Sequence, residues 1–326
     1  MSKKIIPPKL LPGDTICVIA PSKSLSTITK KQRTAAEKKL NEIGLNVIYG
    51  KHVEEIDEFN SSSVASRIAD LHKVFEDKKV KGILAAAGGF NSNQLLRYID
   101  WELIGNNPKI FCGYSDITTL LTAIYTKTGL ITYSSPNFSS FGDPVHGDYT
   151  TDYFVKCLMQ EKPFVVKPAS TWSNSKWEEK WSVRTNEGFW VMQEGEYEGK
   201  ALGENLVTLN FLKGTEYFPN LENSILFLED DFNNSSSDFD EHLQSLIIDR
   251  EFKNIKGIVF GRFQEQSKIT REVLHNIVST KSELRGMPII ANCDFGHTEP
   301  KFTFPFGGTV KIVASKHSSL IQILEH

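Results

Sequence analysis

The stretch Lys109–Leu121, KIFCGYSDITTLL, joins two kinds of local pattern. An apolar run typical of a buried strand ends at Gly-Tyr-Ser-Asp, and a segment with helical apolar spacing follows at once. Ser115 therefore stands at a strand-to-helix junction. Ser and Asp are favourable helix N-caps, so the serine can be a cap alone. A serine on a sharp turn of this kind can also be a nucleophile.

The same alternation continues on both sides of this stretch. It predicts βαβ units, a mostly parallel sheet and helices on both faces, which is the α/β class with a Rossmann-like (flavodoxin-like) N-terminal domain. In the first half, strands are expected at 15–22, 45–50, 81–89, 109–116 and 130–136, and helices at 27–44, 66–80, 92–100 and 118–129.

The second half repeats the pattern after a different segment. Residues 162–200 are polar and aperiodic, yet they hold four of the five tryptophans. Because 326 residues are long for one core, we expect three parts. These are a nucleophile-bearing α/β domain at 1–165, a Trp-rich linker or substrate loop at 166–200, and a smaller α/β domain at 201–326 that carries the acid and the base. In the second half, helices are expected at 204–214, 238–252 and 270–284, and strands at 224–231, 255–263, 287–297 and 309–324.

Composition excludes several classes of protein. A net charge of −3, without a clustered basic face, argues against nucleic-acid binding. No segment approaches the roughly 18 apolar residues of a membrane span. The four cysteines form no C-x-x-C pair, so neither a disulfide framework nor a metal site is indicated, and no cofactor is expected. The first residues, MSKKIIPPKLLPGD, lack a signal-peptide pattern, and we expect a cytoplasmic protein.

Three polar turns fall where strands of the expected sheet end, at Pro21-Ser22, Gly88-Gly89 and Tyr114-Ser115. Ligands gather at the carboxyl ends of parallel strands. With Ser115 as nucleophile, the N–H of Asp116 could hold an oxyanion, and glycine at 88–89 allows a second N–H to approach. Position 117 is Ile, so the full G-x-S-x-G is absent, and the glycines could instead cradle a phosphate.

A base and an acid are needed to complete a serine hydrolase. His297, in the loop NCDFGHTEP after an apolar run, is the best base, and His146 in DPVHGD is its main rival. Glu229 follows four apolar residues in ILFLEDD, where a carboxylate is costly to bury without a partner. The alternative is that Glu229, Asp230 and Asp231 cap the next helix.

The segments AAAGGFNSNQLLRYID, GYSDIT, GENLVTLNFLKGTEYFP, ILFLED and FGHTEPKFTFPFG together resemble the serine LD-carboxypeptidase family, which includes the microcin-immunity proteins. The resemblance implies Ser115 as nucleophile, Glu229 as acid, His297 as base, and an oxyanion hole at Gly89 and Asp116. It also implies a homodimer without a metal.

GGFNSNQLL and the Trp-rich segment resemble the microcin-immunity branch. That branch cleaves the amide between an aspartyl or glutamyl group and a nucleotide. The alternative branch removes D-alanine from a murein tetrapeptide, and an alternative of another class is a protein that binds an aminoacyl nucleotide without turnover. The candidate substrate-binding residues are Gly88, Asn91, Trp172, Trp177 and Asn205.

Overall fold

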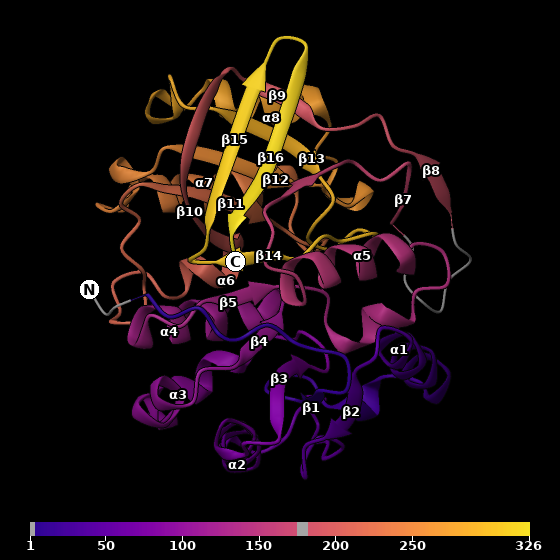
Figure 1. The fold of residues 1–326 in the computed structure, drawn as a ribbon. Coiled ribbons are helices and arrows are strands. Elements are labelled where there is room, and N and C mark those ends of the chain that lie inside the picture. Colours follow the sequence, from indigo (N-terminus) through magenta and orange to yellow (C-terminus); the bar gives the residue numbers. More distant parts are fainter. Residues whose placement is uncertain (1–3, 175–181) are drawn as a thin grey trace. The chain divides into compact units, whose positions relative to one another are not determined.

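The computed structural model describes residues 4–174 and 182–326, which form two compact units (Figure 1). The first unit comprises Met1–Glu161 with Thr303–Phe306 and His326. The second comprises Lys162–Phe302 and Gly307–Glu325. The first unit contains helices and a mainly parallel sheet, and the second contains helices and a mixed sheet whose central strands run parallel, so the predicted α/β class is confirmed.

The sheet of the first unit has six strands: β1 (Thr15–Ile19), β2 (Asn46–Tyr49), β3 (Val80–Ala85), β4 (Ile110–Gly113), β5 (Thr132–Ser134) and β14 (Phe304–Phe306). Their order is β14-β5-β4-β3-β1-β2. The strands β1 to β5 pair in parallel in the flavodoxin-like order 2-1-3-4-5. β14 joins the edge antiparallel to β5 and was not expected from the sequence.

The helices of this unit are α1 (Lys30–Glu42), α2 (Val64–Glu76), α3 (Trp101–Asn106), α4 (Thr118–Thr128) and α5 (Gly147–Leu158). α1 begins at a capping box, in which Thr29 and Gln32 bond each other's backbone N–H. α2 packs on α3 and α3 on α4, whereas α1 and α5 both contact the 3-10 helix η4 (Phe138–Gly142), so the helices form two groups (Figure 1). The helix expected at 92–100 is a 3-10 helix, η2 (Ser92–Tyr98).

The second unit has an eight-stranded sheet of β6 (Phe164–Val166), β9 (Trp190–Gln193), β10 (Gly195–Asn205), β11 (Ser224–Glu229), β12 (Gly257–Gly261), β13 (Ile289–Cys293), β15 (Thr309–Ser315) and β16 (Ser318–Glu325). Its order is β6-β16-β15-β10-β11-β12-β13-β9. The four central strands, β10 to β13, run parallel, and antiparallel strands flank them on both sides. The helices are α6 (Leu206–Asn210), α7 (Ser236–Ile247) and α8 (Arg271–Ser279).

The segment 166–200 differs from the irregular loop that its polarity suggested. It carries β9, residues 195–200 of β10, and a two-stranded sheet of β7 (Thr171–Ser173) and β8 (Val183–Thr185). The polar residues alternate with half-buried ones in β10, which is the pattern of a strand with one solvated face. Trp181 and Trp177 lie outside the described residues.

Buried strands form the centre of each unit. Every residue of β4 and of β11 is buried, as expected for parallel strands covered on both faces. The functional candidates Ser115 and Glu229 stand where these two strands end. Across residues 4–174 and 182–326, no helix combines the length and the apolar character that crossing a membrane would require.

Candidate active site

Ser115 occupies an unusual backbone conformation at the end of β4. Its φ is +66°, in the left-handed region that residues with a β-carbon seldom adopt. The 3-10 turn Ser115–Ile117 then leads directly into α4. The cap residue of that turn is Tyr114, so Ser115 is not the N-cap that one interpretation of the sequence proposed. A strained serine between strand and helix is instead the geometry of a nucleophile elbow.

Two glycines leave room for this elbow. A β-carbon at Gly88 would lie 2.9 Å from Ser115 Cβ and 3.0 Å from its Oγ, so the backbone at 88 faces the serine directly. A β-carbon at Gly113 would lie 2.5 Å from Ile117. The turn of the chain through Ser115 therefore depends on the absence of side chains both within β4 and in the loop after β3.

Asn91 and Asp116 are both buried in the first unit. The amide oxygen of Asn91 accepts from Arg67 Nη1 at 3.2 Å and lies 3.4 Å from the Ser61 hydroxyl, which places this expected substrate ligand beneath the loop surface. The carboxylate of Asp116 also accepts hydrogen bonds, from Ser22 and Ser92. The sequence pattern anticipated the N–H of Asp116 but not a role for its side chain.

Glu229 and His297 meet in the second unit. Glu229 ends β11 and is 1% exposed, and its Oε2 lies 2.7 Å from Nδ1 of His297. His297 stands in the loop after β13, 68 positions along the chain. A carboxylate bonded to Nδ1 fixes the ring and leaves Nε2 as the atom that can exchange a proton with a substrate or nucleophile. The two residues that the sequence predicts as acid and base therefore lie within hydrogen-bond distance of each other, and their catalytic roles stay a prediction.

The surroundings of Glu229 hold its carboxylate in place. Asn205 donates from Nδ2 to Glu229 Oε1 at 2.9 Å, while its own Oδ1 accepts from the N–H of Thr208 and so caps α6. Asn205, expected to contact substrate, thus holds the Glu229 carboxylate. A β-carbon at Gly296 would come 2.5 Å from Glu229 Oε2, and one at Gly261 would come 2.9 Å from Glu229 Cβ. Glu229 is not part of a helix cap, because α7 is capped by Ser235.

Negative charge gathers around the imidazole. Burial of the ring disfavours the imidazolium, but the charge and hydrogen bond of Glu229, helped by Glu204 and Asp231, outweigh it and raise the pKa of His297 to about 9. Burial and the charge of Glu229 likewise raise the pKa of Asp230 to about 7. The site therefore favours the imidazolium form of His297, and the neutral ring, the only form that can take a proton from a nucleophile, becomes more populated as the pH rises towards 9.

The rival histidines have structural partners. His146 is 5% exposed, and its Nδ1 lies 3.3 Å from a carboxylate oxygen of Asp143. His72 accepts a hydrogen bond from the backbone of Asp100, and His52 pairs with Asp70. Burial of His146 makes it a poorer candidate for proton exchange with a substrate than His297, whose side chain is 18% exposed.

Trp172 lines a pocket of about 360 Å³ within the second unit, together with Trp190 and Arg262. The Arg262 guanidinium lies 5.2 Å from the centre of the Trp172 ring. Nη1 of the same guanidinium forms an ion pair with Asp294 Oδ1 at 2.5 Å. Arg184 lies over the same ring at 5.6 Å. Aromatic walls and guanidinium groups suit a planar or anionic group, although a base stacking on Trp172 must compete with these cations.

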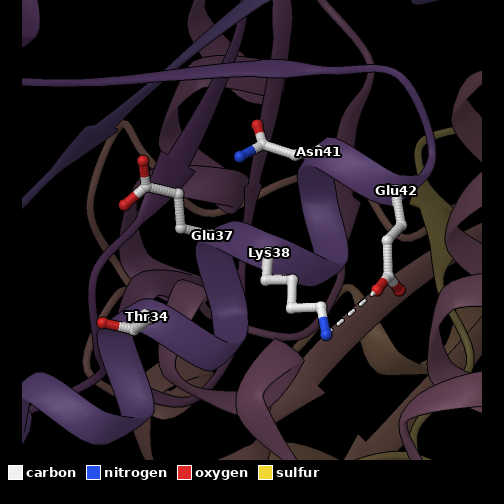
Figure 2. A pocket seen from close by; sticks show the side chains of 5 residues that line it. All are labelled: Thr34, Glu37, Lys38, Asn41 and Glu42. Atoms are coloured by element: carbon white, nitrogen blue, oxygen red, sulfur yellow. Dashed lines mark ion pairs between the residues drawn. The ribbon is translucent and has the colours of Figure 1, made fainter.

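A second hollow, of about 520 Å³, lies along α1 (Figure 2). Its side chains are polar, and Lys38 and Glu42 form an i,i+4 pair at 3.9 Å. None of the candidate residues lines it. Within the described part of the chain, no group of three or more His, Cys, Asp or Glu side chains could hold a metal ion.

We expect the imidazole of His297 to titrate near pH 9. The folded pKa lies above the ordinary value of 6.5, so the stability that the Glu229 pair contributes is complete below about 6.5 and is lost as the pH rises through about 9. NMR titration of the ring signals, assigned with His297→Asn, measures this directly. Glu229→Gln should lower the pKa, and a wild-type titration at or below 6.5 would contradict the electrostatic role of Glu229.

Family models match both halves of the chain. Residues 16–135 match the LD-carboxypeptidase N-terminal domain, and residues 198–312 match the LD-carboxypeptidase C-terminal domain. The "Putative carboxypeptidase YocD" of Bacillus subtilis (strain 168) is 47% identical over 321 residues, covering 98% of this chain and 99% of its own. The microcin C7 self-immunity protein MccF of Escherichia coli is 30% identical over 342 residues, covering 99% and 97%.

Solved structures agree with this assignment. An MccF-like protein from Bacillus anthracis str. Ames has a TM-score of 0.97 at 50% identity, with 99% of this chain and 100% of that chain covered. MccF in complex with aspartyl sulfamoyl adenosine has a TM-score of 0.89 at 29% identity, with 99% of each chain covered. The two-domain fold is thus shared over nearly the whole length, and this chain belongs to the LD-carboxypeptidase family.

Proposed function

We propose that this chain is a serine amidase that cleaves the bond between an acidic aminoacyl group and a nucleotide, with Ser115 as nucleophile, His297 as base and Glu229 as acid. The family supports a carboxypeptidase-type hydrolase. The observation that carries the proposal is the left-handed backbone of Ser115 at a strand-to-helix turn. Backbone strain of this kind clusters at active sites and ligand clamps. The buried Glu229–His297 pair supports the same chemistry.

The mechanism is acyl transfer. His297 takes the proton of Ser115 Oγ, and the oxygen attacks the substrate carbonyl carbon. The N–H groups of Gly89 and Asp116 hold the oxyanion. His297 then gives its proton to the leaving nitrogen, and the C–N bond breaks. Water, activated by the same histidine, releases the acyl group from the serine.

The choice of substrate rests on the relatives. MccF is a microcin C7 self-immunity protein, and its structure holds aspartyl sulfamoyl adenosine. An aminoacyl nucleotide is therefore the first substrate to test, with detoxification of such compounds as the biological role. The alternative within the family is removal of terminal D-alanine from a murein tetrapeptide, which the description LD-carboxypeptidase favours. The alternative of another class is binding of the aminoacyl nucleotide without turnover.

One set of measurements distinguishes these three candidate functions. A fluorophosphonate probe should label Ser115 in the wild-type protein, with the modified peptide identified by mass spectrometry. Hydrolysis of aspartyl sulfamoyl adenosine and of a murein tetrapeptide is then followed side by side. Turnover of the nucleotide alone supports the proposal, and turnover of the tetrapeptide alone supports the murein alternative. Tight binding of the nucleotide with neither labelling nor turnover supports a binding protein.

Ser115→Ala should abolish turnover, with losses on the order of a millionfold, because only the oxyanion hole and substrate binding would remain. His297→Ala should behave alike, and the double variant should lose little more than either single one. Steady-state kinetics on all three variants provides the measurement. More than about a tenth of wild-type activity in Ser115→Ala would exclude it as the nucleophile, and additive losses would show that the two residues do not act as a unit.

Gly88→Ala should also abolish activity, because its β-carbon would lie within 3.0 Å of the Ser115 side chain. Gly105→Ala is the matched control, since a β-carbon there meets Thr128 only at ordinary contact, 3.7 Å. The control should keep wild-type kinetics. Probe labelling at the wild-type rate in Gly88→Ala would be inconsistent with this account of the elbow.

Trp172→Ala should raise KM for an aminoacyl nucleotide by about ten- to a hundredfold, because stacking of a base on an aromatic ring contributes roughly 1–3 kcal/mol. KM for a substrate without a base should stay the same. Trp101→Ala, in α3 of the other unit, is the control. Equal effects on both substrates would assign Trp172 a structural role.

A further inference from the structure

The side chain of Asp116 is the centre of a buried hydrogen-bond network in the first unit. Its Oδ2 accepts from the hydroxyl of Ser22 at 2.6 Å and from the backbone N–H of Ser92 at 2.9 Å. The hydroxyl of Ser92 in turn donates to the backbone carbonyl of Asp116 at 2.7 Å. Residue 116 is thus fixed at both its carboxylate and its carbonyl, directly beside Ser115.

The two partners come from the loops that follow two other strands. Ser22 lies after β1, and Ser92 begins η2, three residues beyond the Gly88–Gly89 turn that follows β3. The Ser22 hydroxyl also fills the space beside Gly89, where an added β-carbon would come within 2.1 Å of Ser22 Oγ. One carboxylate therefore ties the elbow after β4 to both neighbouring loops.

The charge of this carboxylate favours the charged form of a nearby buried guanidinium, that of Arg67. Asp116 is 6% exposed, and a buried anion is costly unless it is hydrogen-bonded and paired. Arg67, 3% exposed, supplies a cation and donates to Asn91 O at 3.0 Å and to Gln94 Oε1 at 2.7 Å. Asn91 and Gln94 flank Ser92 in the same segment. Arg67 and Asp116 therefore hold the loop after β3 from two sides.

We propose that the carboxylate of Asp116 is a positioning group that sets the two oxyanion donors, the N–H of Gly89 and the N–H of Asp116, relative to each other and to Ser115. This inference rests on the proposed function. Through Ser22 the carboxylate holds Gly89, through Ser92 it holds the rest of that loop, and through its own backbone it holds the peptide that follows the nucleophile. Two donors from different loops thereby depend on one side chain.

A misplaced oxyanion donor lowers kcat more than it weakens substrate binding. Oxyanion donors act on charge that develops in the transition state, and loss of one donor costs about 10²–10³ in kcat. Asp116→Asn keeps the size of the side chain but removes its charge, so the oxygen that accepts from Ser22 and Ser92 becomes a weaker acceptor. We expect kcat to fall about 10- to 100-fold, with KM within about twofold of wild type. Ser22→Ala, which removes one of the two hydrogen bonds, should lower kcat by a smaller factor.

The chain offers a matched control in Asp70, on α2 of the same unit. It is 5% exposed, and its carboxylate accepts from the backbone N–H of His52 at 2.9 Å and lies 2.9 Å from the His52 ring nitrogen. Asp70→Asn therefore removes a similarly buried acceptor without touching the elbow. Both Asn variants should lower Tm to a similar extent, and only Asp116→Asn should lower kcat.

The measurements are Tm, kcat, KM and the rate of fluorophosphonate labelling, on the full chain with aspartyl sulfamoyl adenosine as substrate. Slower labelling and a lower kcat in Asp116→Asn, with Asp70→Asn unchanged in both, support the inference. Wild-type kcat in Asp116→Asn and Ser22→Ala overturns it and leaves the proposed function standing. A similar fall in kcat in both Asn variants also overturns it, because the loss would then follow stability. A wild-type protein that is neither labelled nor active overturns both together.

Discussion

The left-handed backbone of Ser115 is the constraint on which the rest of the candidate site depends. Such a conformation costs a residue with a β-carbon about 1–3 kcal/mol and persists only where the surroundings impose it. The surroundings here are glycines at 88 and 113, which leave the space, and the buried carboxylate at 116, which supplies the hydrogen bonds. Most of this support comes from loops at the carboxyl edge of one parallel sheet.

The second unit also places its candidate residues at the carboxyl ends of parallel strands, but there they are an acid and a histidine. Glu229 ends a central parallel strand, and His297 stands in the loop after β13, two strands along the sheet. Glycines again leave room, at 261 and 296, and here they allow a carboxylate rather than a serine to be enclosed. Each unit therefore supports one half of the proposed chemistry at the ends of parallel strands, where backbone and side chains are free to face a ligand.

Sequence patterns predicted what depends on local periodicity. The alternation of strands and helices and the closing strands β15 and β16 followed from it. Glu229 and His297 were singled out by their places at strand ends and by the family resemblance, and the structure shows them within hydrogen-bond distance of each other. Features that depend on partners distant in sequence did not follow. β14 is only three residues long and becomes a strand because β5 offers it an edge. The network around Asp116 forms only where three loops converge in the fold. Arg67 belongs to a helix whose sequence resembles that of an ordinary charged surface helix, so its buried contact with Asn91 could not be predicted. Within 166–200, β9 and the start of β10 likewise take their form from β13 and β15.

The membership of β14 in the first sheet has a consequence for how the chain is made. Residues up to 161 emerge from the ribosome with β5 as an open sheet edge, and the strand that covers it arrives only at 304–306. An uncovered edge is a template for pairing with other chains. The first unit thus reaches its final form only when almost the entire polypeptide has been synthesised. A gene divided at residue 162, between the two units, would therefore encode an N-terminal fragment that lacks β14 and cannot complete the first unit.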